Sequence, residues 1–105
     1  MAVRESYSEY LAKLKARLLG PLGKLDPNVR RDIVEGRIVE EPLNSFVVRV
    51  RASAFTVTQA HVDQLKASGV DEDSIFEATV CAAFVAGLER WQVAMKALGR
   101  SDDAP

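Results

Sequence analysis

Apolar residues recur every three or four positions along much of the chain, which is the spacing of one face of a helix. The first such stretch runs from Arg4 to Leu19 and ends at Gly20-Pro21. Glycine readily adopts the left-handed conformation that follows a helix, and proline cannot continue the hydrogen-bond ladder. We therefore predict an amphipathic helix whose apolar face comprises Tyr7, Tyr10, Leu11, Leu14 and Leu18.

Two short helices are predicted from capping residues at both ends of their apolar patterns. Asp26 can cap a helix that starts at Pro27, where the missing proline N–H costs nothing, and runs to about Ile38. Thr58 can cap another helix that closes at Gly69.

The stretch from Phe46 to Phe55 is compatible with two structures. Phe46, Val48 and Val50 follow each other at two-residue spacing, which is the pattern of one face of a strand. A lone strand would leave its backbone groups unpaired, and no second stretch offers a pairing edge. We therefore predict a helix capped by Asn44 or Ser45.

The last predicted helix is the longest element of the chain. Asp71 can cap it, Glu72 and Asp73 lie in its positive first turn, and no proline interrupts the chain before Leu98. At 1.5 Å per residue this helix measures about 40 Å.

This last helix is apolar around most of its circumference, because a band of small residues lies among larger apolar ones. Small side chains let a second helix approach closely, and a helix that is apolar on all sides is buried on several of them. Four short helices cannot cover so much apolar surface, so we expect a homo-oligomer. The small residues are Ala78, Ala82, Ala83, Ala86 and Gly87.

Length and composition fit one domain over residues 1–105. Of the 105 residues, 48% are hydrophobic and 28% are charged, and a chain far below about 250 residues forms a single core. The predicted fold class is all-α, a compact bundle of about five helices with a long C-terminal helix. Residues 101–105 are predicted to be a disordered tail.

The charge balance and the residue counts disfavour binding to nucleic acid, membranes or zinc. Lys and Arg total 14 against 15 for Asp and Glu, so no positive field attracts nucleic acid or an anionic membrane. The chain lacks a membrane-length apolar window and a secretory signal pattern, which indicates a cytoplasmic protein. One Cys and one His are too few for the usual zinc site, and we expect neither a metal nor a cofactor.

Three side chains are candidates for chemistry. His61 lies in the first turn of the helix capped by Thr58, where the helix dipole favours the neutral imidazole that accepts a proton. Glu41 precedes a proline in a predicted loop, where a carboxylate is either a catalytic group or a solvated charge. Cys81 lies in the middle of the last helix, four residues after Glu77, and is predicted to be a small core residue.

The stretch from Gly69 to Gly87, which reads Gly-Val-Asp-Glu-Asp-Ser-Ile-Phe-Glu-Ala and continues into an alanine-rich run, resembles the C-terminal half of the AhpD-like superfamily. This superfamily includes alkylhydroperoxidase D and carboxymuconolactone decarboxylase, and the similarity covers residues 43–98. The resemblance implies an all-helical fold, a site built between helices, and assembly into trimers or larger oligomers.

The resemblance also implies which family residues are present. His61 matches the position of the family histidine, whereas Ala54 and Val57 occupy the positions of the redox cysteines. Glu41 lies one residue from the position of the family glutamate. A disulfide-forming peroxidase needs both thiols, so the peroxidase branch is disfavoured. The decarboxylase branch works without cysteines and would use Glu41 and His61 for proton transfer.

Two functions therefore remain as alternatives. The first is acid/base chemistry on a small-molecule substrate, which predicts His61 and Glu41 within hydrogen-bond reach of a common point, in a pocket walled by Phe46, Val50 and Phe55. The second is a non-catalytic helical oligomer that serves as a structural or partner-binding subunit, which predicts an exposed His61 with no pocket around it.

Overall fold

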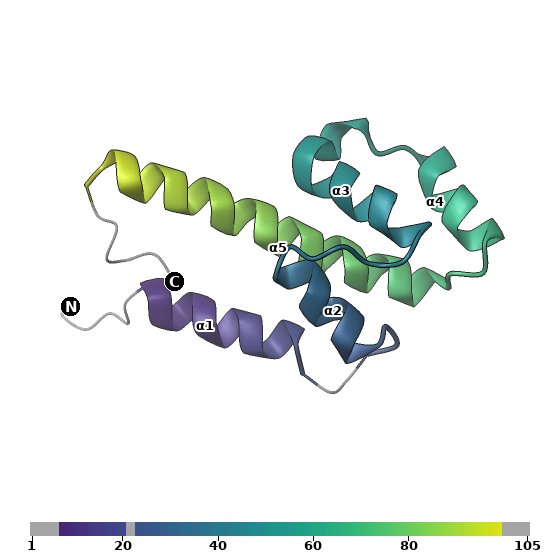
Figure 1. Cartoon of the computed structure of the whole chain (residues 1–105), viewed down its shortest axis with the longest axis horizontal. Helices are drawn as coiled ribbons and strands as arrows, with labels where there is room; N and C mark the ends of the chain where they lie inside the picture. Colours follow the sequence, from purple (N-terminus) through teal and green to yellow (C-terminus); the bar gives the residue numbers. More distant parts are fainter. Residues whose placement is uncertain (1–6, 21–22, 100–105) are drawn as a thin grey trace.

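The computed structural model describes residues 7–20 and 23–99, and all regular structure within these ranges is helical. This confirms the all-α fold class. The expected start of the first helix at Arg4 and the expected tail over 101–105 lie outside the described residues. The elements are α1 (Tyr7–Leu18), α2 (Pro27–Val34), α3 (Leu43–Ser53), the 3-10 turn η1 (Ala54–Thr56), α4 (Gln59–Ala67) and α5 (Glu72–Ala97), as Figure 1 shows.

Helix α5 is the axis of the molecule. In Figure 1, α3 and α4 lie on one side of its N-terminal half, α2 crosses near its middle, and α1 runs along the other side of its C-terminal half. The described molecule extends over 50 × 29 × 23 Å. Although α5 has 26 residues, no helix in the described ranges is long and apolar enough to cross a membrane.

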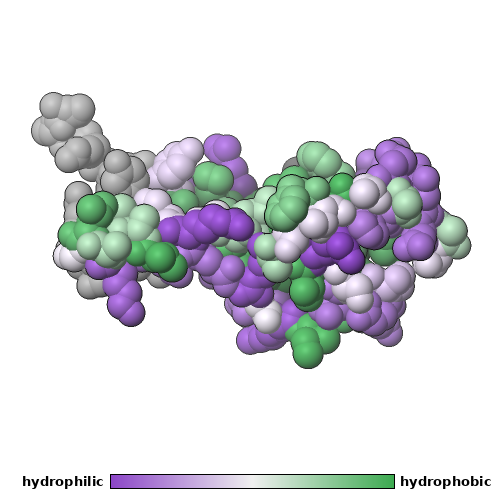
Figure 2. Space-filling view, turned by 90° about the horizontal axis from the view of Figure 1, so that it is seen from above, coloured by the Kyte–Doolittle hydropathy of each residue, from purple (hydrophilic) through white to green (hydrophobic). Residues whose placement is uncertain are grey.

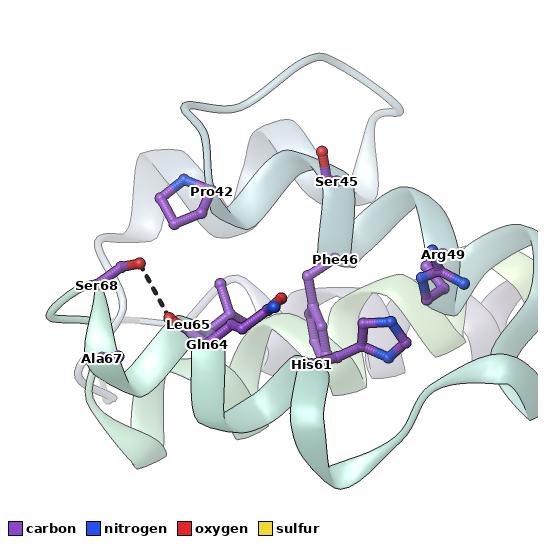
Figure 3. A pocket seen from close by; sticks show the side chains of 9 residues that line it. All are labelled: Pro42, Ser45, Phe46, Arg49, His61, Gln64, Leu65, Ala67 and Ser68. Carbon is purple, nitrogen blue, oxygen red and sulfur yellow. Dashed lines mark hydrogen bonds between the residues drawn. The ribbon is translucent and has the colours of Figure 1, made fainter.

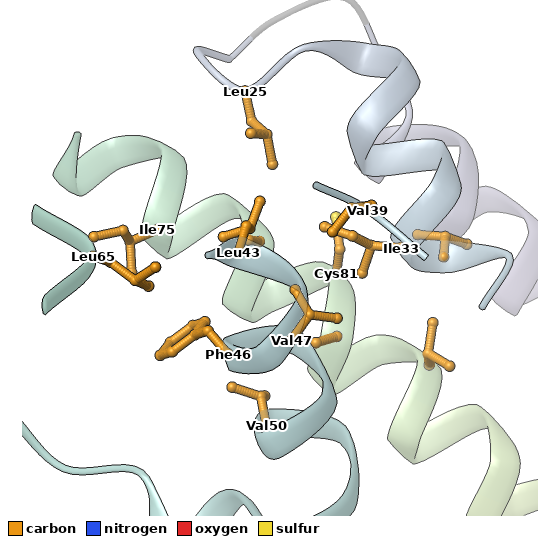
Figure 4. Packing of buried hydrophobic residues seen from close by; sticks show 14 residues of the cluster. Leu25, Ile33, Val39, Leu43, Phe46, Val47, Val50, Leu65, Ile75 and Cys81 are labelled. Atoms are coloured by element: carbon orange, nitrogen blue, oxygen red, sulfur yellow. The ribbon is translucent and has the colours of Figure 1, made fainter. Parts of the chain in front are cut away.

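The core forms where α2, α3 and α4 meet α5. Helix α5 contributes small side chains, of which Ala78 and Ala82 are fully buried. Helices α2 and α3 therefore pack directly on α5, and Figure 4 shows their aliphatic side chains around it. The larger buried residues of this cluster are Leu25, Ile33, Val34, Val39, Leu43, Phe46, Val47, Val50, Leu65, Ile75 and Val85.

Three helix starts agree with their predicted caps. Asp26 is the N-cap of α2, and its side chain accepts a hydrogen bond from the Asn28 backbone N–H at 2.8 Å. Thr58 is the N-cap of α4. Asp71 is the N-cap of α5, and its side chain accepts a hydrogen bond from the Ser74 backbone N–H at 3.1 Å. The pKa of Asp71 lies below its usual value, chiefly because the Ser74 side chain also hydrogen-bonds its carboxylate, and the bond from the Ser74 backbone N–H adds to this effect.

Helix α2 is shorter than predicted, because it ends at Val34 and not near Ile38. Gly36 has a φ of +75°, a left-handed conformation that glycine adopts without the strain of a Cβ atom. The chain then continues in an extended segment in which Ile38 is exposed and Val39 is buried. The glycine therefore overrides the apolar pattern on which the longer helix was predicted.

Helix α3 begins at Leu43, three residues before the predicted start, and neither Asn44 nor Ser45 caps it. The Asn44 side chain accepts instead from the backbone N–H of Val39 at 3.1 Å. The carboxylate of Glu41 accepts from the backbone N–H of Ser45 at 3.0 Å, so Glu41 satisfies a free N–H in the first turn.

A buried arginine fixes the connection between α1 and α2. Arg30 is only 4% exposed, and its guanidinium donates to the carbonyl oxygens of Leu18 and Gly20, both at 2.7 Å, and of Leu25 at 3.2 Å. Glu77 of α5 accepts two backbone N–H groups of the same connection. This network joins the end of α1 to both α2 and α5.

We predict that Arg30→Met lowers the free energy of unfolding by about 2–4 kcal/mol, because three carbonyl oxygens lose their donor. The matched control is Arg31→Met, in the same helix but exposed, which should change stability by less than about 0.5 kcal/mol. Urea unfolding followed by circular dichroism measures both. Equal stability of the two variants would contradict this role of Arg30.

Candidate functional site

A groove of about 590 Å³ lies between α3 and α4. Its walls combine apolar and polar side chains from both helices. Figure 3 shows His61 and Gln64 of α4 on the side that faces Phe46 and Arg49 of α3, whereas the Ser45 hydroxyl points away from α4. The residues that line it are Pro42, Ser45, Phe46, Arg49, His61, Gln64, Leu65, Ala67 and Ser68. The expected histidine is thus part of a groove.

His61 is half-buried, and its ring completes the N-terminal cap of α4. Its Nδ1 accepts a hydrogen bond from the Thr58 backbone N–H at 2.9 Å and lies 3.2 Å from the Thr58 hydroxyl oxygen. This is the capping-box arrangement, with histidine in the place of the usual glutamate or glutamine. Because Nδ1 accepts this bond, the neutral ring carries its proton on Nε2. Figure 3 shows that nitrogen directed toward α3.

The role available to His61 therefore differs from the expected one. The lone pair of the neutral ring at Nδ1 is already used by Thr58. The nitrogen that remains for a ligand is a donor, so His61 can polarise an oxygen atom or give up a proton. Accepting a proton at Nδ1 would first require the loss of the cap.

Glu41 does not line the groove, and neither do Val50 and Phe55, so only Phe46 of the three expected wall residues is in place. Val50 is buried in the core, and Phe55 is 92% exposed on η1. Glu41 reaches the groove through a neighbour, because its Oε2 accepts from the hydroxyl of Ser45 at 3.0 Å.

Arg49 lies one helical turn after Ser45 on the same face of α3. Its Nη1 donates to the Thr56 hydroxyl oxygen at 3.0 Å, and that hydroxyl donates to the carbonyl oxygen of Ser53 at 2.7 Å. Arg51, two residues further on, lies on a different face and pairs with Glu89 of α5. Of these two arginines, only Arg49 lines the groove.

The sequence predicts no binding or catalytic role for the groove residues Ser45, Arg49 and Gln64, and it indicates Ser45 only as a candidate helix cap. The four-residue spacing of Ser45 and Arg49 places them on one face of α3. That spacing groups Ser45 with Arg49, but only the position of α4 opposite α3 makes this face the wall of a groove. In the described part of the chain, no three His, Cys, Asp or Glu side chains come together in a way that could hold a metal ion.

Cys81 lies outside this groove, in the core beside Arg30 and Glu77. It is 1% exposed. Burial raises the pKa of its thiol, Arg30 opposes this change, and Glu77 adds to it. The thiol is therefore protonated at neutral pH and poorly accessible.

Comparisons of the chain with family models, with curated proteins and with solved structures found no significant match.

We predict that native Cys81 reacts with iodoacetamide at neutral pH at least about 100-fold more slowly than the same thiol in urea, because the thiolate is disfavoured and access requires opening of the core. Mass spectrometry of timed samples measures both rates. Labelling of the native protein as fast as that of the unfolded chain would show that the thiol is reactive.

Proposed function

We propose that the chain catalyses proton transfer on a small molecule bound between α3 and α4. The observation that carries this proposal is a proton donor and a proton acceptor on the two walls of one groove. The donor is Nε2–H of His61, and the acceptor is the hydroxyl of Ser45 hydrogen-bonded to Glu41. A cavity of about 590 Å³ is within the range of small-molecule sites.

The acceptor works as a pair. The Ser45 hydroxyl donates to the Glu41 carboxylate, so its lone pairs remain for a proton from the ligand. A C–H bond next to a carbonyl group breaks, its proton moves to Ser45 Oγ, and the hydroxyl proton of Ser45 moves to Glu41. The electron pair of that bond moves into the carbonyl group.

The donor acts on the oxygen atom where this charge develops. His61 donates from Nε2, and a hydrogen bond to the oxyanion lowers the energy of the enolate. The cap with Thr58 holds the ring in this orientation before a ligand binds. The site thus fits proton abstraction next to a carbonyl, followed by return of a proton to the same or another carbon.

The AhpD-like resemblance agrees with this assignment, because it independently selects His61 and the neighbourhood of Glu41. We propose membership of that superfamily on the same basis, in the branch that works without redox cysteines.

The second candidate function is a helical oligomer, and it is favoured by the exposed C-terminal half of α5. Val93 and Leu98 at this end are 70% and 68% exposed, and Figure 2 shows hydrophobic residues on the surface there. The radius of gyration is 15.2 Å, whereas a compact domain of this length has about 13 Å. We propose that a second copy of the chain covers this end of α5. Such assembly is compatible with proton transfer in the groove.

We predict that the protein catalyses exchange of deuterium from D₂O into the position next to the carbonyl of some members of a panel of small ketones, lactones and keto acids. Ser45→Ala and His61→Gln should each slow this exchange by about 10²–10⁴-fold. Glutamine at position 61 retains a capping side chain but cannot transfer a proton. Proton NMR follows the exchange.

Ser68→Ala is the matched control for Ser45→Ala. Ser68 lines the same groove, but its hydroxyl donates to the backbone carbonyl of Gln64 at 2.9 Å. The Ser68→Ala variant should catalyse deuterium exchange at a rate within about twofold of the wild type. Absence of exchange across the panel, or equal rates in all four proteins, would rule out the proton-transfer proposal.

We also predict that the protein sediments as a particle heavier than 11.5 kDa at micromolar concentration, and that Val93→Glu shifts it toward the monomer, because a charge in an apolar interface is costly. Val48→Glu, at an exposed position of α3, is the control and should leave the assembly unchanged. A wild-type monomer would end the oligomer proposal.

A further inference from the structure

The end of the groove near Arg49 has a chemistry of its own. Arg49 carries a full positive charge, and His61 presents its Nε2–H to the same groove. No carboxylate is among the residues that line the groove. Hydrogen-bond donors thus face an open cavity at this end without an anion to accept from them.

We propose that the ligand of this groove is a small carboxylic acid whose carboxylate binds Arg49. The position assigned to its reacting carbon, beside Ser45, rests on the proton-transfer function proposed above. The binding of the carboxylate at Arg49 does not.

The guanidinium of Arg49 is held in place but not neutralised. It makes a hydrogen bond to Thr56, which is itself anchored on the carbonyl of Ser53. Its remaining N–H groups have no carboxylate partner in the described ranges, whereas Arg51 on the same helix is paired with Glu89. A planar guanidinium fixed from one side presents two parallel donors, which match the two oxygens of a carboxylate.

The groove favours an organic monoanion over inorganic phosphate. One arginine balances a single charge. The walls formed by Pro42, Phe46 and Leu65 offer apolar surface to a hydrocarbon segment, whereas a phosphate ion would leave this surface unused.

The order of the polar groups along α3 defines the direction in which the ligand lies. Ser45 and Arg49 are separated by one helical turn, about 6 Å along the helix axis. A short-chain acid whose carboxylate binds Arg49 therefore extends along α3 toward Ser45, four residues earlier. Opposite charges at the two ends also orient the acid, because the Glu41 carboxylate behind Ser45 repels the carboxylate of the ligand.

The test compares pentanoate with pentanamide, a neutral molecule of similar shape, in titrations of the full chain followed by backbone amide shifts in NMR. Pentanoate should shift the resonances of the groove residues and pentanamide should not. Arg49→Gln should weaken pentanoate binding about 10- to 100-fold, the expected effect of losing a charge-assisted hydrogen-bond pair. Arg49 is exposed, and an unchanged circular dichroism spectrum confirms that the variant is folded.

The matched control is Arg31→Gln, which removes the same charge from an exposed position of α2 outside the groove. It should bind pentanoate as the wild type does. The inference is overturned if pentanamide binds as well as pentanoate, if inorganic phosphate binds more tightly, if both arginine variants weaken binding equally, or if pentanoate shifts no groove resonance at about 50 mM.

The two proposals fail in different ways. Pentanoate binding that depends on Arg49, without deuterium exchange on any compound of the panel, retains the carboxylate site and removes the proton-transfer function. Deuterium exchange that depends on Ser45, in a protein whose groove resonances pentanoate does not shift and whose exchange on keto acids is insensitive to Arg49→Gln, retains that function and removes the carboxylate site.

Discussion

The close approach of α2 and α3 to α5 depends on alanines at every fourth position of α5. Ala78, Ala82 and Ala86 follow each other on one face and are at most 6% exposed. The distance between two packed helix axes varies with the side chains at the contact. Methyl groups at these positions let α2 and α3 lie directly on α5, which brings Leu43 and Val47 of α3 into the core.

Packing against α5 positions helix α3, and a different face of α3 lines the groove. Phe46 contributes to both, because it belongs to the core cluster and also lines the groove. The ion pair between Arg51 and Glu89 also links α3 to α5, and their hydrogen bond lowers the pKa of Glu89. Both partners are partly exposed, and such pairs contribute at most about 1 kcal/mol. Apolar contact therefore holds the wall that carries Ser45 and Arg49.

The sequence predicts the helices whose ends have a local cause. Thr58 and Asp71 cap helices as expected, and the long apolar run becomes α5. It does not predict the start of α3, because a carboxylate from the preceding loop satisfies the first turn there. For the same reason the sequence does not predict the groove. It indicates Ser45 as a helix cap, whereas in the structure Ser45 lines the groove. Arg49 is recognised only once α4 is placed opposite α3, a tertiary contact that no spacing within α3 contains.

Because the His61 ring caps α4, the residue at which this helix starts also determines which ring nitrogen of His61 carries the proton. Thr58 must be the residue that precedes α4 for its N–H to reach Nδ1. If α4 began one residue earlier or later, the N-cap residue would change, and His61 would be rotated by about 100° around the helix axis relative to it. The ring would then be free to hold its proton on either nitrogen. The tautomer that the groove presents to a ligand is thus set by where a helix starts, and changes in the loop between η1 and α4 can alter the chemistry of His61 without touching the ring.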